Sequence, residues 1–105
     1  MWYGSKDKEA TLRQRIWLAR HAPNSFRIRM AEQPDEPLRV QMVLAHNVYD
    51  AVRRTLAANP LTAREVLRKL AEDKDHAVAM YVAHNPNTPQ EIRFMLMIEH
   101  PEWVK

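Results

Sequence analysis

The chain repeats itself every 26 residues, and this period constrains its fold more than any other feature of the sequence. One series of apolar residues, 26 apart, consists of Leu18, Leu44, Leu70 and Leu96. A second series with the same spacing consists of Met30, Leu56 and Val82. The steps from one series to the other alternate between 12 and 14 residues without a slip. A fixed period of this length is typical of proteins built from stacked supersecondary units.

Each 26-residue unit is predicted to form two short helices. Apolar residues recur four positions apart, as at Phe26 and Met30, which is the spacing of one helix face. An Ala follows six of the seven apolar anchors, and a small side chain there lets two helices approach closely. The expected helices cover about 10–20, 24–33, 37–46, 50–58, 63–70, 75–84 and 89–98.

The residues around these helices predict how the helices begin and end. Two pairs match a capping box, in which a hydroxyl and a carboxylate each bind a free backbone N–H: Thr62 with Glu65, and Thr88 with Glu91. Pro37 and Pro89 suit the first helical position, where the missing N–H costs nothing. The Asn residues of Asn59-Pro60 and Asn85-Pro86 are expected to cap carbonyl groups at helix ends.

Helices of this length are too short to be stable alone in water, so each must pack on its neighbours. We therefore expect an all-α fold, an α-solenoid of about seven short helices. Residues 1–9 are expected to form an N-terminal arm, because they are polar apart from two aromatic residues. Residues 10–105 are expected to form a single helical-repeat domain.

Composition argues against several classes of site. The chain has no Cys, which excludes disulfides, thiolate metal sites and Cys nucleophiles. Its five His residues show no metal-ligand spacing, and no HExxH motif or Gly-rich phosphate loop occurs. No apolar run approaches the roughly 20 residues of a membrane span, and the first residues lack the apolar core of a signal peptide. We therefore expect a cytoplasmic protein with no metal, no cofactor, no enzyme activity and no membrane association.

Positive charge is concentrated in the first half of the chain. Residues 1–54 hold ten Lys or Arg against six Asp or Glu, whereas the remaining residues hold six against seven. Candidate partner-binding arginines at or beside equivalent repeat positions are Arg27 with Arg53 and Arg54, and Arg13 with Arg39. Such rows can bind phosphate or carboxylate groups. The alternative interpretation is an ordinary solvated charged surface.

The last expected helix is apolar on every side. Its apolar residues include Phe94, Met95, Met97 and Ile98. A helix that is apolar all round needs cover on more than one side, and Met-rich surface is adaptable. We expect a homodimer through this helix, with Met95 or Met97 against its own copy across a two-fold axis, or docking onto a protein partner. The alternative is a monomer in which Trp103 folds back over the helix.

The repeat also resembles a known family. The segment 59–73, closed by Val82-Ala83-His84-Asn85-Pro86, resembles the leucine-rich variant repeat, and residues 85–92 match the opening of the next copy. The resemblance is close over 56–96 and degenerate over 12–55. In that family two short helices per repeat stack into a right-handed superhelix related to HEAT and armadillo arrays, so the resemblance implies a right-handed α-solenoid and a binding scaffold. The founding member also carries a Cys-ligated iron–sulfur cluster, which a chain without Cys cannot hold.

These observations favour a non-enzymatic helical-repeat scaffold that mediates protein–protein interaction. The alternative is a nucleic-acid-binding solenoid that uses the Arg rows of the N-terminal repeats. A third class is a base-excision enzyme on a HEAT-like scaffold, for which Asp50 beside Arg53 and Arg54 is the candidate catalytic residue. The last two classes require a continuous basic groove, and the first does not.

Overall fold

The structure is a computed structural model that describes residues 11–33 and 35–104. The expected arm at residues 1–9 therefore lies outside the described residues. The described part contains seven α-helices, one 3₁₀ helix and no strand, which confirms the prediction of an all-α fold with about seven short helices. The elements are α1 (Leu12–His21), α2 (Asn24–Glu32), α3 (Leu38–Ala45), α4 (Asp50–Ala58), α5 (Arg64–Leu70), α6 (His76–His84), α7 (Gln90–Glu99) and η2 (Pro101–Trp103).

The helices begin at regular 26-residue intervals. Helices α1, α3, α5 and α7 begin at residues 12, 38, 64 and 90, and helices α2, α4 and α6 begin at residues 24, 50 and 76. The residues before α3, α5 and α7, namely Pro37, Ala63 and Pro89, are extended N-cap residues. The prediction that Pro37 and Pro89 occupy the first helical position is therefore wrong by one residue.

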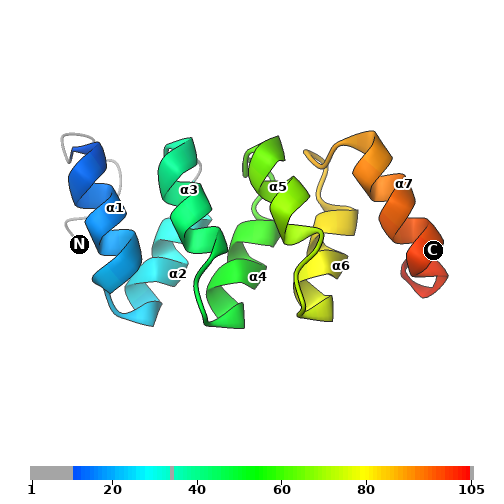
Figure 1. The fold of residues 1–105 in the computed structure, drawn as a ribbon, viewed down its shortest axis with the longest axis horizontal. Coiled ribbons are helices and arrows are strands. Elements are labelled where there is room, and N and C mark those ends of the chain that lie inside the picture. Colours follow the sequence, from blue (N-terminus) through cyan, green and yellow to red (C-terminus); the bar gives the residue numbers. More distant parts are fainter. Residues whose placement is uncertain (1–10, 34, 105) are drawn as a thin grey trace.

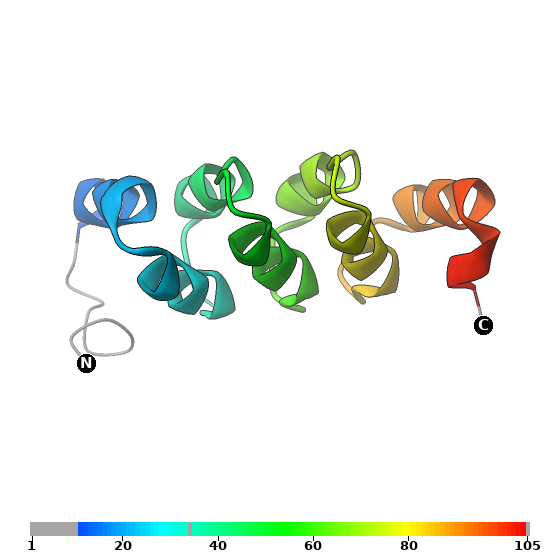
Figure 2. The same cartoon turned by 90° about the horizontal axis from the view of Figure 1, so that it is seen from below.

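Figure 2 shows the helices in two rows along the long axis, with α1, α3, α5 and α7 in one row and α2, α4 and α6 in the other. Helix α4 packs between α2 and α6, and α3 packs between α1 and α5. The last helix departs from this pattern, because α7 packs on α6 and η2 but not closely on α5 (Figure 1). The linear arrangement gives the molecule dimensions of 43 × 22 × 19 Å.

The core lies between the two rows and is formed by the repeat anchors. The buried anchors are Met30, Leu44, Leu56, Leu70, Val82 and Leu96. The alanines that follow five of the seven anchors are buried as well, namely Ala19, Ala31, Ala45, Ala57 and Ala83. Small side chains at these positions let the helices of the two rows approach closely. Leu18, the first anchor, is only partly buried against this core.

The two expected capping boxes, opened by Thr62 and Thr88, do not form. The hydroxyl of Thr62 donates to the backbone O of Leu56 at 2.6 Å, and the hydroxyl of Thr88 donates to the backbone O of Val82 at 2.6 Å. Both Thr residues are buried beside the C-terminal end of a helix, where carbonyl groups lack helical partners. Each Thr therefore satisfies a buried carbonyl of the preceding helix instead of opening the next one.

Asn59 and Asn85 join neighbouring repeats. Nδ2 of Asn85 donates to the backbone O of Ala57 at 2.7 Å and to that of Asn59 at 2.9 Å. Nδ2 of Asn59 donates to the backbone O of Ala31 and to that of Gln33, both at 3.0 Å. The prediction of carbonyl capping is confirmed, but the carbonyls belong to the end of the equivalent helix one repeat earlier.

Replacing Asn85 by Ala should destabilise the fold by roughly 2–4 kcal/mol, because two carbonyl groups lose their shared donor. Asn59→Ala should cause a comparable loss, since it removes the same pair of bonds one repeat earlier. Chemical denaturation measures both losses, with Lys74→Ala as a control at an exposed position. If neither Asn variant differs from the control, the apolar anchors alone hold the repeats together.

Glu36 occupies the repeat position that Thr62 and Thr88 occupy in the following units. Its carboxyl group is buried: Oε1 lies 3.3 Å from Nη1 of Arg15, and Oε2 has no hydrogen-bond partner among the described residues. Burial raises the pKa of Glu36 to about 7, since desolvation outweighs one long ion pair. The first unit therefore carries an ionisable group where the later units carry a neutral hydroxyl.

This raised pKa predicts a pH-dependent stability. The folded state holds the Glu36 proton up to about pH 7 and the unfolded state releases it near the ordinary value of 4.5, so the free energy of unfolding should fall as pH rises through this window. The loss should be on the order of 3 kcal/mol. Glu36→Thr, which installs the residue of the later repeats, should remove the dependence. Urea denaturation at about pH 5 and about pH 8 compares the two proteins, and parallel pH profiles would contradict the assignment.

Candidate functional site

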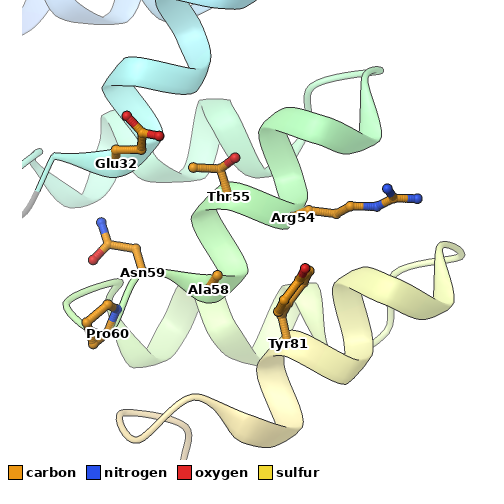
Figure 3. Close-up of a pocket in the computed structure, with 7 residues that line it drawn as sticks. All are labelled: Glu32, Arg54, Thr55, Ala58, Asn59, Pro60 and Tyr81. Carbon is orange, nitrogen blue, oxygen red and sulfur yellow. The ribbon is translucent and has the colours of Figure 1, made fainter.

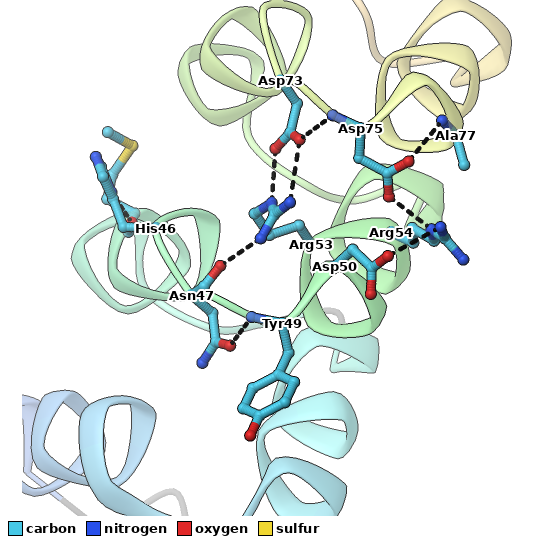
Figure 4. A network of polar contacts seen from close by, with 10 residues as sticks. His46, Asn47, Tyr49, Asp50, Arg53, Arg54, Asp73, Asp75 and Ala77 are labelled. Atoms are coloured by element: carbon cyan, nitrogen blue, oxygen red, sulfur yellow. Dashed lines mark hydrogen bonds and ion pairs between the residues drawn. The ribbon is translucent and has the colours of Figure 1, made fainter.

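A network of ion pairs surrounds two arginines of α4 (Figure 4). The side chain of Arg53 is buried, and its Nε and Nη2 donate to Oδ2 and Oδ1 of Asp73 at 2.7 and 3.2 Å. Its Nη1 donates to the backbone O of Asn47 at 2.6 Å. Oδ1 of Asp73 also accepts from the backbone N of Asp75 at 2.9 Å. Arg53 thus ties α4 to the loop after α3 and to the loop before α6.

Arg54 lies beside this pair and is half exposed. Its Nε donates to Oδ2 of Asp75 at 2.8 Å, and its Nη2 donates to Oδ2 of Asp50 at 3.0 Å. The hydrogen bond from Arg54 lowers the pKa of Asp75, and the same bond raises the pKa of Arg54. Oδ1 of Asp75 accepts from the backbone N of Ala77 at 3.1 Å and so caps α6. The candidate catalytic carboxylate of Asp50 is therefore one side of an ion pair within α4.

Arg27 and Arg53, the first predicted pair, do not form an exposed row. Arg53 is only 6% exposed, because Asp73 from the next repeat reaches back and binds it, and Arg27 is half-buried. The second expected row, Arg13 and Arg39, has exposed side chains without an ion pair in residues 11–33 and 35–104. The structure therefore divides the predicted arginines between a structural network and an exposed pair.

Arg53→Ala should destabilise the fold by roughly 3–5 kcal/mol, because it leaves the carboxylate of Asp73 buried without its cation. Arg54→Ala should cost less, because its side chain is half exposed and screened by solvent. Urea denaturation of both variants separates the two roles. Equal losses would show that burial does not set the strength of these pairs.

A shallow hollow of about 390 Å³ lies on α4 between α2 and α6 (Figure 3). It is lined by Glu32, Arg54, Thr55, Ala58, Asn59, Pro60 and Tyr81. The hydroxyl of Thr55 donates to the backbone O of Ala51 at 2.8 Å, so no base activates it as a nucleophile. The hollow therefore combines the charges of Glu32 and Arg54 with the ring of Tyr81.

Helix α7 presents a large apolar surface. Phe94 is 56% exposed, Met95 is 54% exposed and Ile98 is 79% exposed, whereas Leu96 is buried in the core. Met97, the fourth candidate on this helix, is half-buried. Three of the four predicted residues are thus exposed on the last helix.

A cleft of about 660 Å³ separates α7 from α5. Arg64 and Arg68 line it on the α5 side, and Phe94 and Met97 line it on the α7 side. One ion pair crosses it, with Nη2 of Arg68 2.7 Å from Oε2 of Glu91. A backbone N–H bond and then the bond from Arg68 lower the pKa of Glu91. The cleft exists because α7 does not pack closely on α5, a departure that the regular repeat spacing did not predict.

The C-terminal tail folds back against α6. The ring of Trp103 stacks on that of His100 with centroids 3.8 Å apart, and the backbone O of Trp103 lies 3.1 Å from Nε2 of His84. Trp103 also packs against the edge of the core. The tail supplies part of the cover that the monomer alternative requires, but the exposed side chains of α7 stay uncovered.

No protein-family model, curated protein or solved structure matches the chain. None of the helices in the described part of the chain has the length and apolar character to cross a membrane. The same residues contain no cluster of three His, Asp or Glu side chains that could hold a metal ion.

Proposed function

We propose that this chain is a non-enzymatic scaffold, a right-handed α-solenoid of the leucine-rich variant type, that binds another protein. The 26-residue spacing of helix starts and the two rows of helices support the solenoid arrangement. The match of residues 56–96 to the leucine-rich variant pattern supports the family and the handedness. A cytoplasmic location is part of the proposal, because a chain without Cys is suited to a reducing compartment.

The exposed apolar surface of α7 is the observation that carries this proposal. Phe94, Met95 and Ile98 lie on one terminal helix, and the folded tail does not cover them. Stacked repeats bury each helix against the next, so exposed apolar side chains on α7 offer the kind of surface that another packed element covers. Contiguous apolar surface of this kind marks a protein interaction site.

The first occupant we propose is a second copy of the chain. A two-fold axis through α7 would place Met95 against its own copy and bury Ile98 on both sides, which makes a self-complementary contact. Met97 faces the cleft toward α5, so it would contribute from the edge of such a contact.

The nucleic-acid alternative has weaker support. Two of its five arginines, Arg53 and Arg54, are already bound to Asp carboxylates, which leaves fewer cations for phosphate groups. The base-excision alternative needs a free carboxylate in a basic groove, whereas Asp50 is bonded to Arg54. We therefore retain the protein-binding scaffold as the proposed function.

Ile98→Lys should abolish self-association, because it puts a charge into the proposed apolar contact between the two copies. It should not destabilise the fold of the single chain, because the Ile98 side chain is 79% exposed. Sedimentation equilibrium at micromolar concentration should give a dimer for the wild type and a monomer for this variant. Thermal unfolding of the variant monitors the fold.

Leu61→Lys is the matched control, since Leu61 is 58% exposed in the loop before α5 and far along the chain from α7. It should leave the dimer intact. The proposal for α7 would be wrong if two results came together. The wild type would stay monomeric, and it would capture the same proteins from a host extract as Ile98→Lys.

A further inference from the structure

Two neighbouring repeats each contain a cavity at an equivalent position. The first, of about 500 Å³, is lined by Ala19, Arg20, Arg27, Met42, Val43, His46, Asn47 and Val48. The second, of about 410 Å³, is lined by Ala45, His46, Asn47, Val48, Arg53, Glu72, Asp73 and Lys74. Six residues of the first cavity, all except Met42 and Val43, have their equivalents 26 positions later in the second. The two cavities therefore allow a comparison of one site with two different sets of side chains.

In the second cavity a carboxylate of the chain itself binds the arginine. Arg53 uses Nε and Nη2 to hold both carboxylate oxygens of Asp73, and Nη1 to reach the backbone O of Asn47 (Figure 4). Asp73 is fixed for this role because its Oδ1 accepts from the backbone N of Asp75. The arrangement is a bidentate pair between a guanidinium edge and a planar carboxylate.

In the first cavity the residue equivalent to Asp73 is Asn47, and the pair is missing. Oδ1 of Asn47 accepts from the backbone N of Tyr49 at 2.8 Å, which is the same local bond that Asp73 makes two residues ahead. The other end of this side chain is therefore an NH₂ group, a donor, where Asp73 has an acceptor oxygen. Figure 4 shows this amide nitrogen turned away from Tyr49.

The equivalent arginine, Arg27, also has a donor without an acceptor. Its Nη1 donates to the backbone O of Arg20 at 3.3 Å, and its Nη2 donates to Oδ1 of Asn24 at 2.8 Å. Its Nε is buried and has no hydrogen-bond partner. Arg27 and Asn47 thus supply donors to one cavity that contains no acidic lining residue, whereas the second cavity has two.

We propose that the first cavity binds a carboxylate group supplied by another molecule. The ligand carboxylate lies between the guanidinium of Arg27 and the amide of Asn47, accepting from Nε and Nη2 of Arg27 and from Nδ2 of Asn47. Nε of Arg27 is buried in the unliganded chain, and its Nη2 is bonded to Asn24. To bind the ligand, the Arg27 side chain therefore breaks the bond to Asn24 and turns toward Asn47. Arg20 adds a second positive charge, and the apolar wall at Met42, Val43 and Val48 suits the carbon chain that carries the carboxylate.

This site goes beyond the proposed scaffold function and does not depend on it. The cavity lies between the first two units, α1 to α3, whereas the proposed dimer contact lies on α7 at the other end (Figure 1). We choose a planar carboxylate over phosphate because the internal counterpart, Asp73 on Arg53, is itself a planar bidentate carboxylate. The carboxylate can come from an acidic side chain or from a chain terminus, and the probes below separate these sources.

The test is an NMR titration that follows the Arg27 Nε–Hε signal in the full chain. The probes are acetate, N-acetyl-glutamate amide for a side-chain carboxylate, N-acetyl-alanine for a terminal carboxylate, and inorganic phosphate. We expect a saturable shift of this signal with acetate and with at least one of the two amino-acid probes. Phosphate should bind at least about tenfold more weakly than acetate, because its oxygens are not coplanar like those of the Asp73 carboxylate.

Asn47→Asp is the decisive variant, because it rebuilds the pair that Arg53 and Asp73 form. It should raise the melting temperature and weaken probe binding about tenfold or more, since the new carboxylate occupies the site. Arg27→Ala should also abolish binding, which is followed through the side-chain NH₂ signal of Asn47 because this variant has no Arg27 signal. Arg29→Ala, an exposed arginine on the same helix, should leave binding unchanged. Equal binding to wild type and Asn47→Asp, equal shifts with phosphate and acetate, or no shift with any probe would each overturn the proposal.

Discussion

The capping of one helix by the next repeat is the interaction on which the rest of this structure depends. Helices of seven to ten residues leave most of their C-terminal carbonyl groups without a helical partner. Asn59 and Asn85 satisfy such carbonyls in the preceding unit, and Thr62 and Thr88 satisfy one within their own unit. Each unit thus completes the backbone hydrogen bonding of its neighbour, so the repeat spacing cannot drift without leaving buried carbonyls unsatisfied. The 26-residue interval between helix starts follows from this requirement together with the burial of the anchors.

A fixed framework allows single repeat positions to change chemistry without changing the fold. The position of Glu36 holds a buried carboxyl in the first unit and a Thr hydroxyl in the next two. The position of Asn47 holds an amide, and Asp73 holds a carboxylate one unit later, with the same local bond to the backbone two residues ahead. Because the surrounding geometry repeats, such differences can be read as substitutions at one site. In the first units, Nε of Arg27 and Oε2 of Glu36 are buried without a hydrogen-bond partner, whereas the equivalent Arg53 and Thr62 are bonded.

The sequence predicted the helices well and their polar contacts poorly. Apolar anchors fix a helix face by spacing alone, so the helix starts were predicted to within one or two residues. Polar side chains can bind groups far along the chain: Thr62 matched a cap motif but binds a buried carbonyl, and Arg53 is bound by Asp73 from the next unit. Conversely, the capping box that does form, at Thr11 and Gln14, opens a helix that was expected to begin earlier.

For the candidate surfaces too, the apolar residues could be predicted from the sequence and the packing around them could not. The apolar run of α7 was visible in the sequence, because no polar residue interrupts Phe94 to Ile98, and most of it is exposed. The cleft beside it was not visible, because Leu96 keeps the repeat spacing and is buried while the helix stays apart from α5. Nη2 of Arg93 donates to the backbone O of Asn85 at 2.8 Å, the carbonyl equivalent to that of Asn59, which Asn85 binds one repeat earlier. Arg93 therefore binds one of the two carbonyl groups that an Asn binds in the earlier repeats, while the apolar side chains of α7 stay exposed. The proposed contact with another chain is placed on α7 for this reason, because Phe94, Met95 and Ile98 are exposed there.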